Sequence, residues 1–325
     1  MIDMATASWP FFGFNPWAGV PGNTNVSRSE PAGGGEFLSG TFDSDARSIQ
    51  YKLYIPSAYR NTPSPAALPL VVMLHGCGQS AADFALGTGM NELAEEAQCL
   101  VLYPEQSAQA NWNRCWNWYE AAHHERDEGE PALIAALTRS LIGQYAVDES
   151  RVSVAGLSAG GAMAVILGRT YPDLFKAVGC HSGLAHRSAT DGLSAMSAMR
   201  DGADLAACKQ STPLASIPVI VFHGDEDRTV HQKNSADVVQ QTIESHLAQV
   251  PGEAREMAVH EETGETSGRS FTRHTHCDET GEVVAEQWTI HGSGHAWSGG
   301  NLHGSYADAR GPDASKEMLR FFIEQ

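Results

Sequence analysis

The chain has 325 residues, and 21 Lys and Arg against 39 Asp and Glu give it a formal net charge of −18. An acidic chain repels phosphate groups, so the composition argues against nucleic acids and anionic membranes as partners. Its apolar runs end after about five residues, far short of the 18 or more that a membrane-spanning helix needs. With 42% hydrophobic residues it is typical of a globular protein.

Residues 1–37 are predicted to form an irregular N-terminal arm rich in Gly, Pro, Asn and Ser. Its aromatic side chains are Trp9, Phe11, Phe12, Phe14 and Trp17. We interpret it as an arm packed on its own domain, with a surface anchor as the alternative. The first residues lack the basic start and long apolar core of a secretory signal, so the sequence shows no export address.

Residues 38–325 are predicted to form a single domain. Tyr51, Leu53 and Ile55 alternate with other residues as in a strand that ends at Pro56. Short apolar strands then alternate with amphipathic helices. The predicted strands are 70–75, 99–103, 152–155, 177–181, 218–223 and 286–290, and the predicted helices are 90–97, 132–145, 159–170, 235–248 and 313–323.

Apolar strands separated by helices indicate an α/β fold, in which helices cover both faces of a mostly parallel sheet. Such sheets bind ligands at the carboxyl ends of their strands. Two segments interrupt the alternation. Residues 184–216 are too long and polar for a simple connection, and we interpret them as a cap or lid. Residues 268–290 have the pattern of a hairpin with its turn at 278–281.

The six cysteines are widely spaced and show no pattern of zinc ligands, so no metal or organic cofactor is implied. Cys99 and Cys180 lie in apolar strands and are expected to be core residues. The other four lie in polar or loop-like context, which leaves room for one or two disulfides: Cys77, Cys115, Cys208 and Cys277.

The strongest catalytic signal is Gly156-Leu157-Ser158-Ala159-Gly160, between a predicted strand and a predicted helix. A tight strand-to-helix turn needs small residues two positions before and after the serine, and it exposes the serine hydroxyl. We therefore predict that Ser158 is a nucleophile. The N-terminus of the helix that follows stabilises the negative charge that develops during acyl transfer.

A serine nucleophile needs a base and an orienting carboxylate, in the chain order Ser, Asp, His. Asp227 follows one predicted strand and His295 another, so we predict that they fill these roles. Asp225 is the rival carboxylate, with a loop-bracing role as its alternative. His291 and His231 are the rival bases. A packed or surface position would also explain His291, and His231 lies close to the carboxylate loop, where a base is not usual.

Acyl transfer also needs two backbone N–H donors for the oxyanion. Ala159, after the nucleophile, is predicted to supply one. Cys77 is predicted to supply the other, because His75-Gly76-Cys77-Gly78-Gln79 follows an early strand. An ordinary glycine turn after a core histidine is the alternative reading of this segment.

Five motifs in this order resemble the polyhydroxybutyrate (PHB) depolymerase family of esterases, an α/β-hydrolase group that includes feruloyl and acetylxylan esterases. They are His75–Gln79, Asn113–Trp118, Ala155–Gly161, Phe222–Asp227 and Gly294–Gly300. The resemblance implies an α/β-hydrolase fold, a triad of Ser158, Asp227 and His295, and oxyanion donors at Cys77 and Ala159. It also implies a disulfide between Cys77 and Cys115 that fixes the oxyanion loop.

We hypothesise a serine carboxyl-ester hydrolase that cleaves short-chain hydroxyalkanoate polyesters or their oligomers. The alternatives are a feruloyl or acetylxylan esterase, an acyltransferase, and a non-catalytic binding protein with the same fold. The resemblance favours an extracellular location, with the cytoplasm as the alternative. The residues expected to contact substrate are Trp116, Trp118, Tyr119, His231 and Trp297. Core packing is the alternative for Trp116 and Trp118.

Overall fold

The computed structural model describes residues 34–44, 47–60, 65–206, 216–249 and 256–325. The arm predicted at residues 1–37 therefore lies almost wholly outside the described residues, although strand β1 (Glu36–Ser44) includes its last two positions. None of the helices in these ranges is long and apolar enough to cross a membrane.

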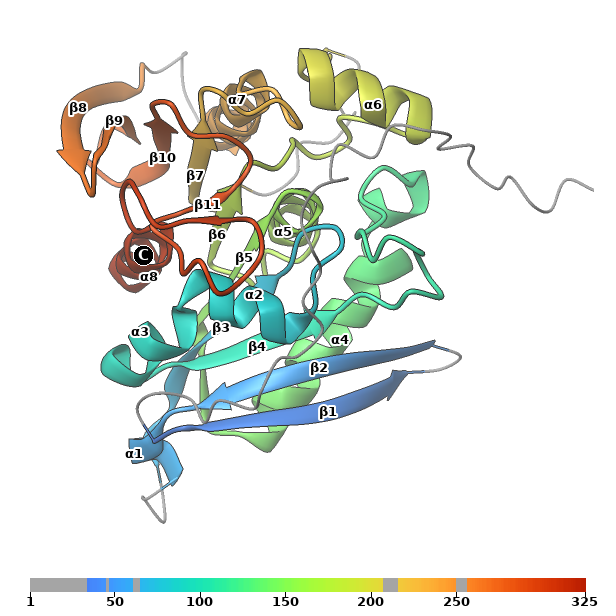
Figure 1. Ribbon diagram of the computed structural model, residues 1–325. Helices are drawn as coiled ribbons and strands as arrows, with labels where there is room; N and C mark the ends of the chain where they lie inside the picture. The colour runs from blue at the N-terminus through green and yellow to red at the C-terminus, as the bar shows by residue number, and fades with distance from the viewer. Residues whose placement is uncertain (1–33, 45–46, 61–64, 207–215, 250–255) are drawn as a thin grey trace, which may run out of the picture. The chain divides into compact units, whose positions relative to one another are not determined.

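A ten-stranded sheet runs through the described part of the chain in the order β1-β2-β4-β3-β5-β6-β7-β10-β9-β8 (Figure 1). Its central strands are parallel, whereas β1 and β2 at one edge and β9 and β8 at the other pair antiparallel. The mostly parallel sheet expected from the sequence is thus confirmed. The strands after β1 are β2 (Arg47–Ile55), β3 (Leu68–Leu74), β4 (Leu100–Glu105), β5 (Val147–Leu157), β6 (Ala177–His181), β7 (Val219–Gly224), β8 (Ala258–Thr266), β9 (Arg269–Cys277) and β10 (Val283–Ile290).

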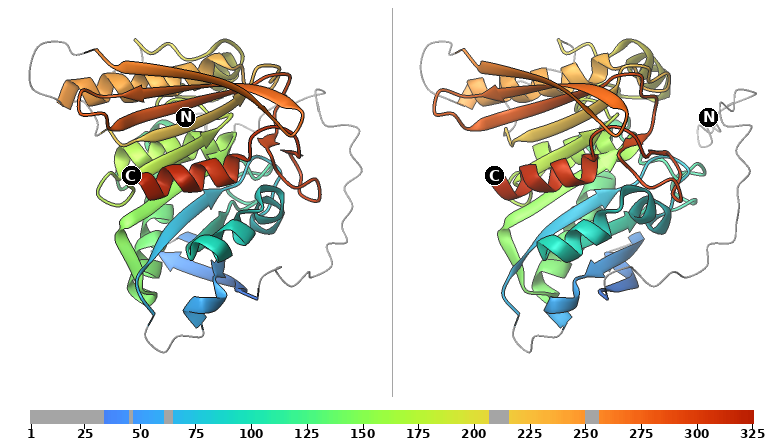
Figure 2. Two further views of the ribbon diagram at one scale, coloured as in Figure 1. Left: turned by 90° about the vertical axis from the view of Figure 1, so that its left-hand side faces the viewer. Right: turned by 60° about the vertical axis from the view of Figure 1, so that its left-hand side comes forward.

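Both faces of the central strands are buried, which explains why these strands are apolar at almost every position. In β3, Leu70 and Val72 point to one hydrophobic cluster, and Val71 and Met73 point to the other. The first cluster includes residues of α4 (Gly129–Gln144), α5 (Ala159–Thr170) and α7 (Lys233–Gln249). The second includes residues of α2 (Ala81–Thr88), α3 (Met90–Ala97) and α8 (Ala314–Glu324), and Figure 2 shows α8 lying along its face of the sheet.

Several short elements complete the connections. They are α1 (Ser57–Arg60), the 3-10 helix η1 (Ala121–His124), α6 (Gly192–Asp201), β11 (Trp297–Ser298) and β12 (Ala307–Asp308). Within the segment interpreted as a lid, α6 begins with a capping box of Asp191 and Ser194 and contacts α7. Residues 207–215 of that segment lie outside the described residues.

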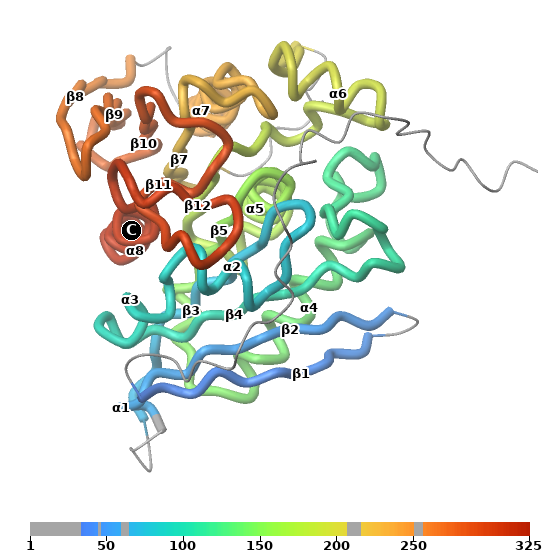
Figure 3. Tube along the Cα trace, viewed as in Figure 1, coloured from blue at the N-terminus to red at the C-terminus, as the bar shows by residue number. Residues whose placement is uncertain are grey.

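β9 and β10 form an antiparallel pair whose connection turns at Asp278–Gly281, where the Gly281 N–H donates to the Asp278 carbonyl over 3.0 Å. β10 also pairs in parallel with β7, and so joins this hairpin to the parallel centre. Figure 3 follows the chain from β10 through the long loop around β11 and β12 into α8. The carboxyl end of β10 therefore opens into a loop on the same edge of the sheet as the ends of β5 and β7.

Candidate active site

The predicted functional residues follow strands of the parallel centre at their carboxyl ends. Cys77 follows β3, Ser158 follows β5, Asp227 follows β7 and His295 follows β10. These strands are neighbours in the order β3-β5-β6-β7-β10, so one edge of the sheet presents all four loops.

Ser158 occupies a strained turn between β5 and α5. Its backbone has φ 57° and ψ −119°, a conformation that a residue other than glycine rarely adopts. A Cβ at Gly160 would collide with the carbonyl oxygen of Leu74, and one at Gly156 would collide with the backbone of Gly160. The close approach of β3, β5 and α5 is the physical reason for the small residues on either side of Ser158.

Asp227 and His295 are brought together by the loops after β7 and β10. The Nδ1 atom of His295 lies 2.6 Å from Oδ2 of Asp227. Because a carboxylate accepts hydrogen bonds, Nδ1 carries the ring proton and Nε2 keeps a lone pair. Burial raises the pKa of Asp227, but hydrogen bonds from His223 and His295 outweigh this and hold the pKa well below its usual range.

The rival residues Asp225 and His291 pair with each other instead. Nδ1 of His291 lies 2.8 Å from Oδ2 of Asp225, and the Gly292 N–H donates to Oδ1 of Asp225 over 2.7 Å. Nε2 of His291 faces the hydroxyl of Thr272 on β9 at 3.0 Å. Asp225 therefore braces the start of the loop that follows β10, as its alternative role in the sequence suggested.

His181, at the end of β6, joins the serine turn to the histidine loop. Its carbonyl accepts the Ser158 N–H over 2.8 Å, and its ring Nε2 accepts the Ser298 N–H over 3.0 Å. The ring is stacked between Phe222 and Trp297, with centroids 5.9 and 5.1 Å away. Burial lowers the pKa of His181 to about 3, which keeps Nε2 free to accept this bond.

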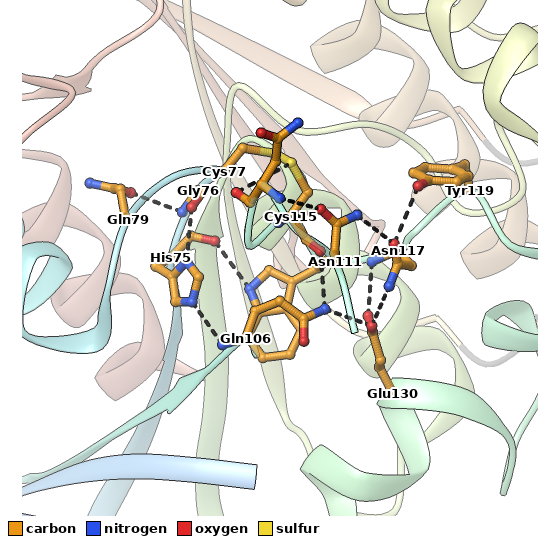
Figure 4. The surroundings of a disulfide bond; sticks show 12 residues. His75, Gly76, Cys77, Gln79, Gln106, Asn111, Cys115, Asn117, Tyr119 and Glu130 are labelled. Atoms are coloured by element: carbon orange, nitrogen blue, oxygen red, sulfur yellow. Dashed lines mark hydrogen bonds between the residues drawn. A yellow bond between two sulfur atoms is a disulfide. The ribbon is translucent and has the colours of Figure 1, made fainter. Parts of the chain in front are cut away.

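The oxyanion loop predicted at Cys77 is tied to the segment around Cys115 (Figure 4). The implied disulfide between Cys77 and Cys115 is confirmed. The Trp116 indole N–H donates to the His75 carbonyl over 3.1 Å, and the Gln106 N–H donates to Nε2 of His75 over 3.0 Å. Burial lowers the pKa of His75, so this ring stays neutral and accepts that bond.

Glu130 of α4 accepts hydrogen bonds from Gln106 and Asn117 of this segment, as Figure 4 shows. Its carboxylate accepts from Nε2 of Gln106 at 2.6 Å, Nδ2 of Asn117 at 2.6 Å and the Asn117 N–H at 2.8 Å. Nε2 of Gln106 also donates to the Cys115 carbonyl over 3.0 Å. The Glu130 carboxylate thus holds the backbone on both sides of Trp116, directly at Asn117 and through Gln106 at Cys115.

Of the remaining cysteines, Cys99 and Cys180 lie in the core as predicted, whereas Cys277 does not form one of the disulfides that its context allowed. Cys99 and Cys180 are free and buried in the core, and burial raises the pKa of each thiol to about 12. Cys277 is also free and buried, so no disulfide involves it. Cys208 lies outside the described residues.

The aromatic residues predicted at the substrate are mostly packed side chains. Trp297 is only 1% exposed, and its indole N–H donates to the Ser315 hydroxyl over 3.0 Å. The prediction that Trp297 contacts the substrate is therefore wrong. Its ring packs in the core between Phe84 and His181. Burial of the large apolar ring is favourable, and its N–H keeps a hydrogen-bond partner in the core.

Trp116 and Trp118 are also buried, which agrees with the core packing weighed for them from the sequence. Trp116 nevertheless borders a cavity of about 430 Å³, together with polar residues that include Gln106, Asn117 and Glu130. Tyr119 is partly exposed and its hydroxyl lies 3.2 Å from Oδ1 of Asn117. These contacts place Trp116 and Tyr119 beside the disulfide segment.

His231 is exposed next to the start of α7, where its Nδ1 accepts the Lys233 N–H over 3.1 Å. It therefore serves as a local cap in this structure. Among the described residues, no group of three or more His, Cys, Asp or Glu side chains is arranged to hold a metal ion.

Sequence reasoning did not identify His181, His223 or Glu130 as parts of the site. Like His75, His181 and His223 stand at the carboxyl ends of strands that are otherwise apolar. A polar ring at the end of successive buried strands was the signal available for the histidines. Glu130 had no comparable signal, because an acidic residue in the first turn of a helix usually stabilises the helix dipole.

The family described as Esterase PHB depolymerase matches residues 49–262. The poly(3-hydroxyalkanoate) depolymerase C of Paucimonas lemoignei is 31% identical over 78% of this chain and 60% of its own length. A feruloyl esterase B of Neurospora crassa is 32% identical over 44% of this chain and 47% of its own length. The chain thus spans about half to three-fifths of these two relatives.

Among solved structures, an acetyl xylan esterase from Aspergillus awamori superimposes with a TM-score of 0.63 over 90% of this chain and 100% of that one. The sequence identity is 18%, so this likeness concerns the fold. It agrees with the α/β-hydrolase fold that the sequence implied.

Proposed function

Because the chain belongs to the PHB depolymerase family of esterases, we propose that it is a serine carboxyl-ester hydrolase in which Ser158, His295 and Asp227 act together. The observation that carries the proposal is the 2.6 Å contact between His295 and Asp227 on the edge of the sheet where Ser158 stands in its strained turn. This arrangement leaves Nε2 of His295 as the proton acceptor for a serine hydroxyl.

In the proposed reaction, the Ser158 oxygen attacks the ester carbonyl while Nε2 of His295 takes the hydroxyl proton. The backbone N–H groups of Cys77 and Ala159 stabilise the tetrahedral oxyanion. Ala159 is the first residue of α5, where a backbone N–H has no acceptor within the helix. His295 then gives its proton to the leaving alcohol, and a water molecule activated by the same base releases the acid from Ser158.

Asp227 holds the imidazole in the required tautomer and stabilises the imidazolium that forms after proton transfer. Its buried position and low pKa support this role, because the carboxylate remains ionised wherever His295 can act as a base. The other residues near the edge, Asp225 and His291, are engaged with each other and are not assigned to the reaction.

For the substrate, we propose a short-chain hydroxyalkanoate polyester or its oligomers. The support is that the depolymerase relative matches 78% of the chain, whereas the feruloyl esterase relative matches 44%. A feruloyl or acetyl ester of plant polysaccharide is the second candidate, favoured by the feruloyl esterase match. Tyr119, which is partly exposed, is the proposed substrate contact, and the disulfide supports an extracellular location.

Hydrolysis assays of the wild type and Ser158→Ala on 3-hydroxybutyrate oligomers, methyl ferulate and p-nitrophenyl acetate test the proposal. We expect cleavage of the oligomers to be fastest and the variant to lose at least about a thousandfold in kcat. Faster release of ferulate would move the substrate to the second candidate. Comparable activity of the variant would remove Ser158 from the reaction, and a folded but inactive wild type would support the non-catalytic alternative.

A further inference from the structure

The carboxylate of Asp227 contacts a second imidazole besides that of His295. Its Oδ1 accepts the N–H groups of Thr229 and Val230, each over 2.9 Å. Its Oδ2 lies 2.6 Å from Nδ1 of His295 and 3.4 Å from Nε2 of His223. The side chains of His223 and Asp227 are 1% and 0% exposed, so both contacts are shielded from water.

The proton on His223 is fixed by its neighbours. Its Nε2 lies 2.8 Å from the Val230 carbonyl as well as 3.4 Å from Oδ2 of Asp227. Both oxygens accept hydrogen bonds, so Nε2 must carry a hydrogen that they share. Since the Val230 N–H binds Oδ1 of Asp227, His223 closes a ring of contacts around this carboxylate.

We propose that His223 is a positioning residue for the reaction: its Nε2–H holds the loop of Asp227 in place and takes up part of the carboxylate's negative charge. The inference rests on the proposed function, in which Asp227 orients His295. Sharing the charge between two imidazoles weakens the pull of Asp227 on the proton of His295. Loss of the Nε2–H of His223 would leave the whole charge of Asp227 facing His295.

Among the described residues, the other titratable and charged groups near the Asp227 carboxylate are either neutral or exposed. His181 of β6 is the further titratable side chain that interacts with Asp227, His223 and His295, and burial keeps it neutral above about pH 3. The charged neighbours on the loop of Asp227 itself are exposed to solvent, which screens them: Asp225, Glu226 and Arg228. His231, which follows this loop in the sequence, is also exposed.

The test compares His223→Phe, which keeps a ring without a donor, with His223→Gln, whose amide reaches the position of Nε2. The measurement is the pH dependence of kcat/KM between pH 4 and 9. We expect the acid limb of His223→Phe to move upward by about half a pH unit or more, with kcat reduced about tenfold. His223→Gln should keep its acid limb close to that of the wild type.

His291→Gln is the matched control, because it removes an imidazole that contacts Asp225 rather than Asp227. Its acid limb should not move. If His223→Phe does not fold, His223→Asn replaces it, since the shorter amide ends near the position of Nδ1 and should produce the same shift. The inference is overturned if the acid limb does not move in His223→Phe or His223→Asn, or if it moves equally far in His223→Gln.

Failure of the inference can be distinguished from failure of the proposed function. If Ser158→Ala and His295→Gln remain active, the proposed function is wrong, whatever His223 does. If both are inactive while the acid limb of the His223 variants stays in place, the triad stands and only the role of His223 is lost.

Discussion

The backbone N–H of Gly78 donates to the carbonyl of Asn113 over 2.8 Å, directly beside the Cys77–Cys115 disulfide. The proposed oxyanion loop is therefore joined to the Cys115 segment by a hydrogen bond as well as a covalent bond. Further bonds from Trp116 and Gln106 to His75 fix the start of the loop. We conclude that the covalent bond is one of several constraints on the position of the Cys77 N–H.

Replacing Cys115 with Ser should consequently lower stability more than catalysis. The disulfide spans 38 residues of sequence, and a closed loop of this size stabilises a fold by roughly 3–4 kcal/mol. We expect a lower Tm in thermal unfolding but a kcat within about tenfold of the wild type, because the hydrogen bonds remain. A reductant should lower the Tm of the wild type and leave the variant unchanged. Complete loss of activity in a folded variant would show that the disulfide alone positions the donor.

Glu130→Gln should weaken the same loop through its non-covalent support. The substitution places an NH₂ group against the donors of Gln106 or Asn117, which now face a carboxylate. We expect the free energy of unfolding to fall by about 2–3 kcal/mol and kcat to fall with little change in KM. Urea unfolding and steady-state kinetics measure the two effects. Glu120→Gln, at an exposed position on the preceding segment, is the control and should change neither.

His181 should make the folded state sensitive to moderate acid. Its pKa is about 3 in the fold, whereas the unfolded chain has an ordinary histidine pKa of about 6.5. The unfolded state therefore binds a proton first, so stability is present above about pH 6.5 and is lost as the pH falls towards 3. The neutral variant His181→Gln should be less stable at pH 7. Its deficit should shrink by about 2 kcal/mol by pH 5, and a constant deficit in urea unfolding would contradict this account.

Gly160→Ala should disrupt the serine turn, because the added Cβ would collide with the backbone carbonyls of Leu74 and His75. We expect a loss of about 3 kcal/mol or more in the free energy of unfolding, with loss of esterase activity. Gly143→Ala in α4 is the matched control, since its Cβ would meet no atom within 4 Å. It should be neutral or stabilising by about 0.5–1 kcal/mol. Equal stability of the two variants would argue against the steric explanation.

The central strands and the long helices were predictable from the sequence because their burial pattern is regular. Met90–Ala97 and Ala159–Thr170 form helices with the predicted bounds, and the predicted strand 177–181 is β6. β1 and α2 were not predicted. α2 has apolar residues on much of its surface and is defined by its ends, where Ser80 caps it and Gly89 terminates it with φ 62°.

For the site, chain order and glycine spacing indicated Ser158, Asp227 and His295, and the structure places the last two in contact. The residues that contact these side chains and loops from behind could not be predicted. Contacts such as those of His223 with Asp227 and of Glu130 with Asn117 depend on how the loops pack. The prediction for Trp297 was wrong for a related reason. Its place two residues after His295 suggested a substrate contact, but the β11–β12 pairing turns this part of the loop into the core.

Labelling of the intact protein with a serine-directed fluorophosphonate, followed by mass spectrometry, shows whether Ser158 is the reactive serine. We expect one adduct on Ser158 in the wild type, none in Ser158→Ala, and much slower labelling in His295→Gln, because the base is removed. A folded wild type that stays unlabelled, or an equal rate of labelling in Ser158→Ala, would rule out Ser158 as the nucleophile.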